Sequence, residues 1–350
     1  MVEIVRTVGR YELLDVLGRG GAGVVYRARQ TDLDRLVAVK QLVDLSGGDA
    51  QLVARFLREA RLAGTLTHPN IVPVYEYLEH DGSAYIAMEL LPHGSLRGYM
   101  GSLDLARIGG VLEGILAALI YASGKFVHRD IKPENVLVGG DGRVKLGDFG
   151  IARAIGATTT QATLTTAGGI IGSPAYMAPE QATGGELGPW TDLYSTGVVA
   201  YELLVGERPF PRAGTPAAAV RQLVSDPIRP PIELRPSLDP GLAEWLERAL
   251  RKTPTDRHSS AADAWETLEE HLVRLLGERW RRTSAIAVDP APSLSMPPPR
   301  SSPAPATATA RALDASADEL PTRSRVARLA AIAVPLAALA ALLAAIAAGR

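Results

Sequence analysis

The sequence predicts an α+β protein with two lobes, a small β-rich lobe followed by a larger helical one. As far as residue 90, short stretches rich in valine and tyrosine stand between glycine-containing turns, which is a pattern typical of strands. From about residue 103, apolar residues recur at helical spacing instead. A segment rich in proline, alanine, serine and threonine (283–324) and a wholly apolar stretch (329–348) follow. We expect the first to be a disordered linker and the second a transmembrane helix.

Composition narrows the functions open to the chain. The net charge is −1 over 350 residues and the pI is about 6.6, so we expect no nucleic-acid partner. The absence of cysteine excludes disulfides, cysteine-based zinc sites and thiol nucleophiles. The six histidines show no metal-ligand spacing. Residues 1–10 carry charge and no long apolar run, so we expect no cleaved signal peptide.

A glycine-rich loop lies between the first two expected strands, at about 11–17 and 24–28. Gly18, Gly20 and Gly23 would let backbone N–H groups approach phosphate oxygens without a Cβ in the way. A dinucleotide site shares this spacing but requires a helix directly after the glycines. Here a stretch rich in valine and tyrosine follows, so we interpret the loop as a flap over ATP. An ordinary hairpin turn is the alternative.

Two charged residues of the first lobe form a predicted ion pair. Lys40 ends an apolar strand, and Glu59 lies on the apolar face of a helix that we expect at 49–66. An inward carboxylate needs a cationic partner to offset its desolvation. We expect Lys40 to be that partner, and the pair to hold the lysine toward the α- and β-phosphates of ATP. A surface position is the alternative for Glu59.

The segment that joins the lobes is predicted to face an adenine ring. It follows two expected strands, at 71–77 and 85–90, which an Asp81-Gly82 turn separates. Backbone groups of residues 89–91 would meet the ring. The further ATP-binding residues that we expect are Leu17, Val25, Ala38, Glu89, Leu91 and Leu137. Three of them, Val25, Ala38 and Leu137, fit a plain core equally well.

The most informative stretch is 128–135, His-Arg-Asp-Ile-Lys-Pro-Glu-Asn, which Asp148-Phe149-Gly150 follows. Two short apolar runs with turn residues at 139–142 between them predict a hairpin. The hairpin would bring Asn135, which precedes it, close to Asp148, which follows it. An amide oxygen beside a carboxylate suits Mg2+, and Asp130 would reach a hydroxyl next to that cation. A solvated polar loop is the alternative.

Taken in order, these motifs resemble the eukaryotic-type protein kinase signature, and their texture is similar to the bacterial, especially actinobacterial, membrane serine/threonine kinases. The matching motifs are Gly18/Gly20/Gly23, Val-Ala-Val-Lys40, Glu59, His128-Arg129-Asp130, Lys132, Asn135, Asp148-Phe149-Gly150 and Ala178-Pro179-Glu180. The resemblance covers about residues 8–276. It implies a bilobal protein kinase fold with an N-lobe at 8–90 and a C-lobe at 91–276.

The resemblance also implies a role for each matching residue. Asp130 accepts or orients the proton of the acceptor hydroxyl, and Lys132 contacts the γ-phosphate, as is typical of serine/threonine kinases. Asn135 and Asp148 hold Mg2+, for which Mn2+ is an alternative. The structural residues that it implies are Asp192, which ties down the catalytic-loop backbone, and Glu180 and Arg257, which form a long-range ion pair.

The loop after the second motif is rich in threonine and lacks the pattern of a stable element. We predict autophosphorylation at Thr165 and Thr166, because Arg129 and Arg153 would pair with a phosphate there. A merely polar loop is the alternative.

The apolar stretch 329–348 holds 20 residues without a charged or polar side chain. As a helix it would span about 30 Å, the thickness of the hydrocarbon core of a membrane. Arg323, Arg325 and Arg328 precede it, so the positive-inside tendency places the lobes in the cytoplasm of a single-pass cell-membrane protein. Only Gly349 and Arg350 follow, so we expect no extracellular sensor domain. A docking helix is the alternative.

We therefore expect a serine/threonine protein kinase that transfers the γ-phosphoryl group of ATP to proteins and acts in signalling at the cytoplasmic membrane. Two other functions stay open. One is a pseudokinase scaffold, against which the intact Lys40, Asp130, Asn135 and Asp148 count. The other is a small-molecule phosphotransferase of related fold. The resemblance also allows a homodimer through the N-lobe.

Overall fold

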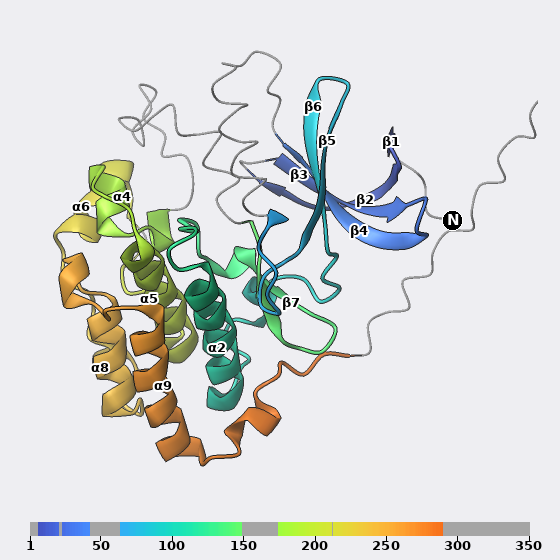
Figure 1. Ribbon diagram of the computed structural model, residues 1–350. Helices are drawn as coiled ribbons and strands as arrows, with labels where there is room; N and C mark the ends of the chain where they lie inside the picture. Colours follow the sequence, from blue (N-terminus) through green and yellow to red (C-terminus); the bar gives the residue numbers. More distant parts are fainter. Residues whose placement is uncertain (1–5, 21–22, 43–63, 149–173, 212, 290–350) are drawn as a thin grey trace, which may run out of the picture. The chain divides into compact units, whose positions relative to one another are not determined.

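The computed structural model describes residues 6–20, 23–42, 64–148, 174–211 and 213–289 (Figure 1). All of them belong to the first of two compact units, Met1–Pro298. Residues 49–63 of the expected helix at 49–66, the threonines of the threonine-rich loop and the expected membrane span lie outside the described residues.

The N-lobe is an antiparallel sheet with strand order β1-β2-β3-β4-β6-β5. Its strands are β1 (Arg6–Val8), β2 (Tyr11–Gly20), β3 (Gly23–Gln30), β4 (Arg35–Leu42), β5 (Val74–His80) and β6 (Ser83–Met88). The predicted turn between the last two is present, since Asp81 and Gly82 both have positive φ, 48° and 71°. The pairing of β3 with β4 sets Lys40 opposite Val25, next to the glycine loop.

The predicted strand at 71–77 begins later than expected. β5 starts at Val74, directly after Pro73, which has no N–H to donate to a ladder. Ile71 instead forms an isolated parallel bridge with Leu146, and the Val72 N–H donates to the Leu146 carbonyl at 3.0 Å. This bridge joins the N-lobe to the C-lobe. β6 also ends earlier than expected, at Met88 rather than 90.

The C-lobe is organised around two largely buried helices, α2 (Leu105–Ala122) and α5 (Pro189–Val205). The other helices are η1 (Leu96–Tyr99), η2 (Pro133–Asn135), η3 (Pro174–Tyr176), α4 (Pro179–Thr183), α6 (Pro216–Val224), α7 (Pro231–Leu234), α8 (Pro240–Ala249), η4 (Pro254–Asp256), α9 (Ala261–Leu276) and η5 (Trp280–Thr283). A small hairpin, β7 (Val136–Val138) and β8 (Val144–Leu146), packs against α2. Helices α4 to α8 each begin with proline, whose fixed φ and missing N–H suit a first helical turn.

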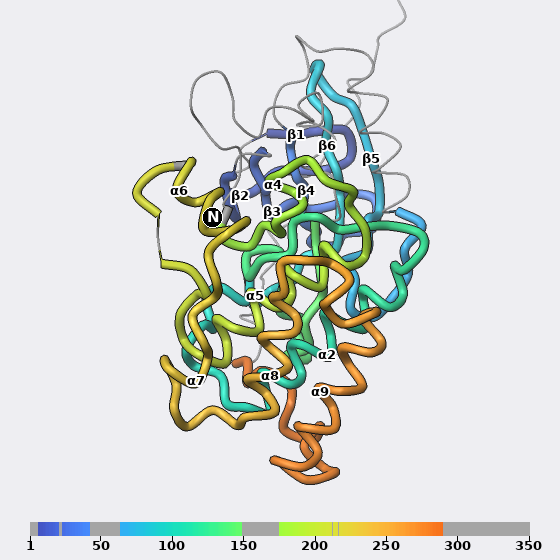
Figure 2. The backbone as a smooth tube through the Cα atoms, turned by 90° about the vertical axis from the view of Figure 1, so that its left-hand side faces the viewer, coloured from blue at the N-terminus to red at the C-terminus, as the bar shows by residue number. Residues whose placement is uncertain are grey.

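Helix α2 is the one helix among the described residues that is long and apolar enough, by length and composition, to cross a membrane. Of that window, 61% is buried inside the protein, so its apolar side chains serve the core. Its N-terminus is capped by Asp104, whose side chain accepts from the Arg107 N–H. Figures 1 and 2 both show α9 alongside α2.

The packed part of the chain continues past α9 to residue 289. Trp280 and Ile286 are each only 3% exposed, and Val288 packs against the same core. We placed 283–289 in the disordered linker, and that start is too early. The average composition of the long linker hides the two apolar residues, Ile286 and Val288, at its beginning.

Candidate active site

The loop before the hairpin has an unusual backbone that a buried acid holds in place. Arg129 and Asp148 have positive φ, 66° and 58°, which is uncommon for residues other than glycine and is often found at functional sites. The two carboxylate oxygens of Asp192, on α5, accept the N–H groups of His128 and Arg129, both at 2.7 Å. Burial raises the pKa of Asp192 above its usual range, while the nearby positive charges and the two N–H groups oppose that shift.

Asp130 accepts hydrogen bonds from two of the predicted site residues, Lys132 and Asn135. Lys132 Nζ donates to Asp130 Oδ2 at 2.8 Å. Asn135 Nδ2 donates to the same Oδ2 at 2.9 Å and to the Asp130 carbonyl at 2.8 Å. Because both bonds use the amide nitrogen, Asn135 turns its other side-chain atom, the oxygen acceptor, away from Asp130. The carboxylate of Asp130 is 40% exposed, so a hydroxyl can approach it.

Lys40 and Asp148 form an ion pair between the two lobes. Lys40 Nζ lies 2.7 Å from Asp148 Oδ1, with the two side chains 4% and 29% exposed. Burial by itself would raise the pKa of Asp148, but the Lys40 ammonium holds it below its ordinary value, so the carboxylate is charged. Glu59, the partner that we predicted for Lys40, lies outside the described residues.

The predicted hairpin brings Asn135 and Asp148 to the same end of two short strands. β7 pairs with β8, with Val136 opposite Leu146. The Gly147 N–H donates to the Asn135 carbonyl at 2.8 Å, and His128 Nε2 lies 2.8 Å from the Gly147 carbonyl. An amide oxygen and an ionised carboxylate are oxygen donors of the kind that hard cations prefer, so these residues fit Mg2+ or Mn2+.

The glycine loop is a strand–loop–strand unit, not the start of a helix. Gly18 and Gly20 of β2 pair with Val25 and Gly23 of β3. Gly23 has φ of 138°, and a Cβ there would lie 1.9 Å from the Gln41 carbonyl oxygen, so a side chain is excluded. This geometry favours the flap over the dinucleotide alternative.

The expected adenine-binding residues gather in one apolar cluster between the lobes. Val25, Ala38 and Leu137 come from three separate strands and pack together with Leu91. Leu17 is 48% exposed, at the end of the sheet near the glycine loop. The Glu89 N–H bonds the Pro73 carbonyl at 3.1 Å, so only its own carbonyl can serve a ring at that position.

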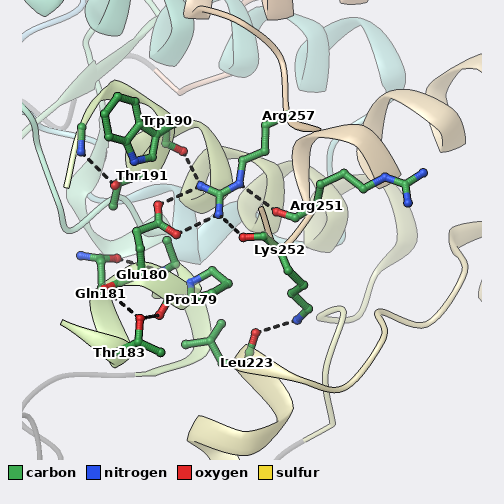
Figure 3. A network of polar contacts seen from close by, with 12 residues as sticks. Pro179, Glu180, Gln181, Thr183, Trp190, Thr191, Leu223, Arg251, Lys252 and Arg257 are labelled. Atoms are coloured by element: carbon green, nitrogen blue, oxygen red, sulfur yellow. Dashed lines mark hydrogen bonds and ion pairs between the residues drawn. The ribbon is translucent and has the colours of Figure 1, made fainter. Parts of the chain in front are cut away.

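The predicted ion pair between Glu180 and Arg257 is present and buried (Figure 3). The guanidinium donates to both carboxylate oxygens at 2.8 Å, and its other N–H groups reach the carbonyls of Trp190, Arg251 and Lys252. Burial opposes ionisation of Glu180, but Arg257 keeps the pKa of the carboxyl below its ordinary value. The pair connects α4 with the segment after α8.

Sequence reasoning missed several polar residues around the site. Gln181 donates from its side chain to the Arg129 carbonyl at 2.9 Å, and Lys145 pairs with Glu89 of the lobe linker at 2.6 Å. The sequence could have predicted that Lys145 faces away from the core, because in the expected strand it stands between the apolar residues Val144 and Leu146. Arg97 contacts Glu134, Tyr176 and Glu202. These four residues come from four separate segments, so no local sequence pattern predicts the cluster.

Four of the predicted residues remain untested by the geometry. Glu59, Arg153, Thr165 and Thr166 all lie outside the described residues. Arg129 is described, and its Nε is buried without a hydrogen-bond partner in the described part of the chain.

Comparison with known proteins places the whole arrangement in one family. Residues 11–271 match the protein kinase domain family. The chain is 37% identical over 287 residues to the serine/threonine-protein kinase pkn3 of Myxococcus xanthus, covering 79% of this chain and 52% of that protein. It is 42% identical over 280 residues to a probable serine/threonine-protein kinase of Streptomyces coelicolor, covering 78% and 41%. The chain thus spans about half the length of the curated relatives it matches.

A solved structure agrees with this assignment. The kinase domain of PknI from Mycobacterium tuberculosis superposes with a TM-score of 0.59 at 26% identity, covering 77% of this chain and 99% of that one. A β-rich N-lobe and a helical C-lobe, with the motif residues at their junction, form the protein kinase fold. By its sequence match and its architecture, the chain belongs to the protein kinase family.

Proposed function

We propose that the chain is a serine/threonine protein kinase that transfers the γ-phosphoryl group of ATP to hydroxyl groups of proteins. The observation that carries the proposal is the joined cluster of Asp130, Lys132 and Asn135, which one backbone hydrogen bond links to the segment holding Asp148. The names of the relatives, serine/threonine-protein kinases, support the choice of acceptor.

Each residue of the cluster has a task that suits its position. Asp130 orients the acceptor hydroxyl and receives its proton, and Lys132 places a positive charge beside it. The Asn135 amide oxygen and the Asp148 carboxylate would hold Mg2+, or Mn2+ in its place, which neutralises charge on the phosphate oxygens when bound. Lys40, held by Asp148, points its ammonium toward the junction of the lobes, where it suits the ATP phosphates.

The remaining ATP contacts follow from the same geometry. The glycines of the loop, Gly18, Gly20 and Gly23, would cover the phosphates. The apolar cluster around Ala38 and Leu137 would enclose the adenine, with Glu89 and Leu91 offering backbone groups. Asp192 and the Glu180–Arg257 pair would act only by holding the catalytic loop and its neighbours.

Asp130→Asn tests the proposal directly. We expect the variant to lose roughly 100-fold or more of the wild-type rate of phosphate transfer, because an amide cannot accept the proton. Incorporation of labelled phosphate into a generic protein substrate is the measurement. Asp141→Asn is a matched control, since Asp141 is an exposed acid (67%) in the hairpin turn. Near-wild-type transfer by pure Asp130→Asn protein would contradict the assigned role.

The intact set of functional side chains distinguishes this function from the two others. A pseudokinase scaffold would bind nucleotide without turnover, so a single ATP-turnover assay separates it. A small-molecule phosphotransferase would phosphorylate a metabolite in preference to a protein, and a competition between the two acceptors separates that one.

We also propose that the activity is regulated by autophosphorylation at Thr165 and Thr166. Arg129 supports this, because its buried Nε has no hydrogen-bond partner among the described residues and suits an anionic partner such as a phosphate. Arg153 would be the second cation. We expect mass spectrometry of active enzyme to find phosphate on one or both threonines, and Arg129→Met to lower the activity of the phosphorylated form. An unmodified loop in fully active protein would contradict this regulation.

We further propose a single-pass cell-membrane protein, with residues 329–348 as the transmembrane helix and the kinase domain, residues 8–276, in the cytoplasm. The run of apolar residues and the three preceding arginines support it. A homodimer through the N-lobe is part of the same proposal for signalling at the membrane.

A further inference from the structure

The chain turns back onto the C-lobe after α9 instead of leaving it. Gly277, with φ of 83°, ends α9, and residues 277–289, here called the C-terminal strap, run from there to the β7–β8 hairpin (Figure 1). Trp280 and Ile286 anchor the strap, since each is 3% exposed within the main core. The match to the protein kinase domain family ends at residue 271, so the strap lies beyond the matched region.

The strap lies on three glycines whose missing side chains leave room for it. A Cβ on Gly109 of α2 would lie 2.9 Å from the Trp280 ring, and a Cβ on Gly110 would lie 2.3 Å from the Ser284 carbonyl oxygen. A Cβ on Gly142, in the hairpin turn, would lie 2.1 Å from the Ile286 carbonyl oxygen. At Gly110 and Gly142 the clash would be with the backbone of the strap, so only glycine fits there while the strap is docked, whereas at Gly109 the Trp280 and Leu272 side chains would have to shift.

Glycine at 109 and 110 is costly for the helix that contains it. Each glycine in a helix interior lowers helix stability by about 1 kcal/mol relative to alanine. Two adjacent ones therefore weaken α2 unless another interaction offsets the loss. The close approach of the strap, together with that of Leu272 to Gly109, is such an interaction.

The strap is bonded to the turn of the catalytic hairpin. The Ile286 N–H donates to the Gly142 carbonyl at 2.9 Å, and the Gly142 N–H donates to the Gly139 carbonyl at 3.0 Å. The hairpin also rests on α2, because a Cβ on Gly114 would lie 2.6 Å from the Val144 side chain. Gly110 and Gly114 are four residues apart, so strap and hairpin share one face of α2.

We propose that the C-terminal strap is a positioning element for the metal-binding pair, Asn135 and Asp148. The hairpin has strands of three residues, too short to be rigid alone. Its strands are held by the Asn135–Gly147 bond and by bonds of Leu146 to Val72 and of Val138 to Gly94, and its turn is tied by the strap. Release of the turn frees the hairpin to shift and separates the two side chains. The proposal rests on the function proposed for that pair.

Two substitutions in the full-length protein test it. Gly110→Ala raises the helix propensity of α2, but its Cβ would clash with the Ser284 carbonyl of the strap. Ile286→Ala removes the anchor next to Gly142. Gly140→Ala is the matched control, because a Cβ at Gly140, in the same hairpin turn, meets nothing within 4 Å. Leu268→Ala, in α9, controls for lost burial, since Leu268 is 1% exposed.

The measurements are hydrogen exchange of the Gly147 amide and Mn2+ binding counted by electron paramagnetic resonance with a non-hydrolysable ATP analogue. In Gly110→Ala and Ile286→Ala we expect Gly147 exchange to be roughly tenfold faster and Mn2+ binding to be about threefold to tenfold weaker. At saturating metal, kcat should stay within about twofold of wild type while the KM for metal–ATP rises. Gly140→Ala should match wild type, and Leu268→Ala should lower Tm without changing Mn2+ affinity.

Wild-type exchange and wild-type Mn2+ affinity in both strap variants would overturn the proposal. The hairpin would then hold the metal-binding pair without help from the strap. Both readouts work without catalysis. A wild-type protein that binds Mn2+ and nucleotide but transfers no phosphate would therefore disprove the proposed function and leave this test intact.

Discussion

Lys252 shows how one residue makes stability depend on pH. Its Nζ donates to the Leu223 carbonyl at 2.7 Å, at the end of α6 (Figure 3). It also lies 4.2 Å from the Phe210 ring centroid. Burial lowers the pKa of this ammonium from 10.5 to about 8. Between those pH values the unfolded chain holds a proton that the folded chain has released, so stability must rise with pH there.

We therefore predict that wild type gains about 1–2 kcal/mol of unfolding free energy relative to Lys252→Met between pH 7.5 and pH 10, a figure discounted for partial solvent screening. Below pH 7.5 the amine is charged in both states, so the difference should be flat. Urea unfolding of both proteins at several pH values is the measurement. A difference independent of pH over the whole range would contradict the shifted pKa.

At the scale of elements, the Glu180–Arg257 pair fastens α4, which leads to the catalytic loop through Gln181, to the segment before α9. Arg257 is 0% exposed at its side chain, so removing it leaves a buried carboxylate without its cationic partner and takes one donor from each of three carbonyls. We predict that Arg257→Met lowers the unfolding free energy by about 3–5 kcal/mol.

A second change distinguishes the lost charge from the lost packing. Glu180→Gln added to Arg257→Met removes the unpaired charge and should restore part of the stability. Arg248→Met is the control, because the Arg248–Asp263 pair is exposed (44% and 27%) and should matter by less than about 1 kcal/mol. Denaturant unfolding of the four proteins checks the order, and an Arg257→Met protein as stable as Arg248→Met would refute it.

The elements that the sequence predicts well are those with a local cause. The Asp81-Gly82 turn and the β7–β8 hairpin follow from turn residues between apolar runs, and the structure contains both. Ile71 departs from expectation because a proline two residues later breaks the ladder, and a distant strand takes up the pairing. The strap escapes prediction because its partners, Gly110 and Gly142, lie far back in the sequence.

The same distinction holds for the site. The spacing of Asp130, Lys132 and Asn135 is local, and the structure joins all three. Gln181 and Arg97 act on the loop from other elements, and only the fold brings them there. Residues such as these, whose contacts with the site come from distant elements, can be identified only from the three-dimensional structure.

At the scale of the whole molecule, the proposed membrane anchor and the kinase domain occupy different parts of the chain, and three truncations test them separately. We predict that a chain ending at residue 325 leaves the membrane fraction while its phosphate transfer per molecule stays at the wild-type rate.

The other two truncations test the packing of the strap. A chain ending at 289 keeps the strap and should have the same Tm as the chain ending at 325. A chain ending at 276 loses Trp280 and Ile286, both 3% exposed, and should be less stable by about 4 kcal/mol or more. Cell fractionation and thermal unfolding are the measurements. Full-length protein found in the soluble fraction would disprove the anchor, and equal Tm values for the chains ending at 276 and 289 would disprove the packing of the strap. Because the two results are independent, either part of the prediction can fail without the other.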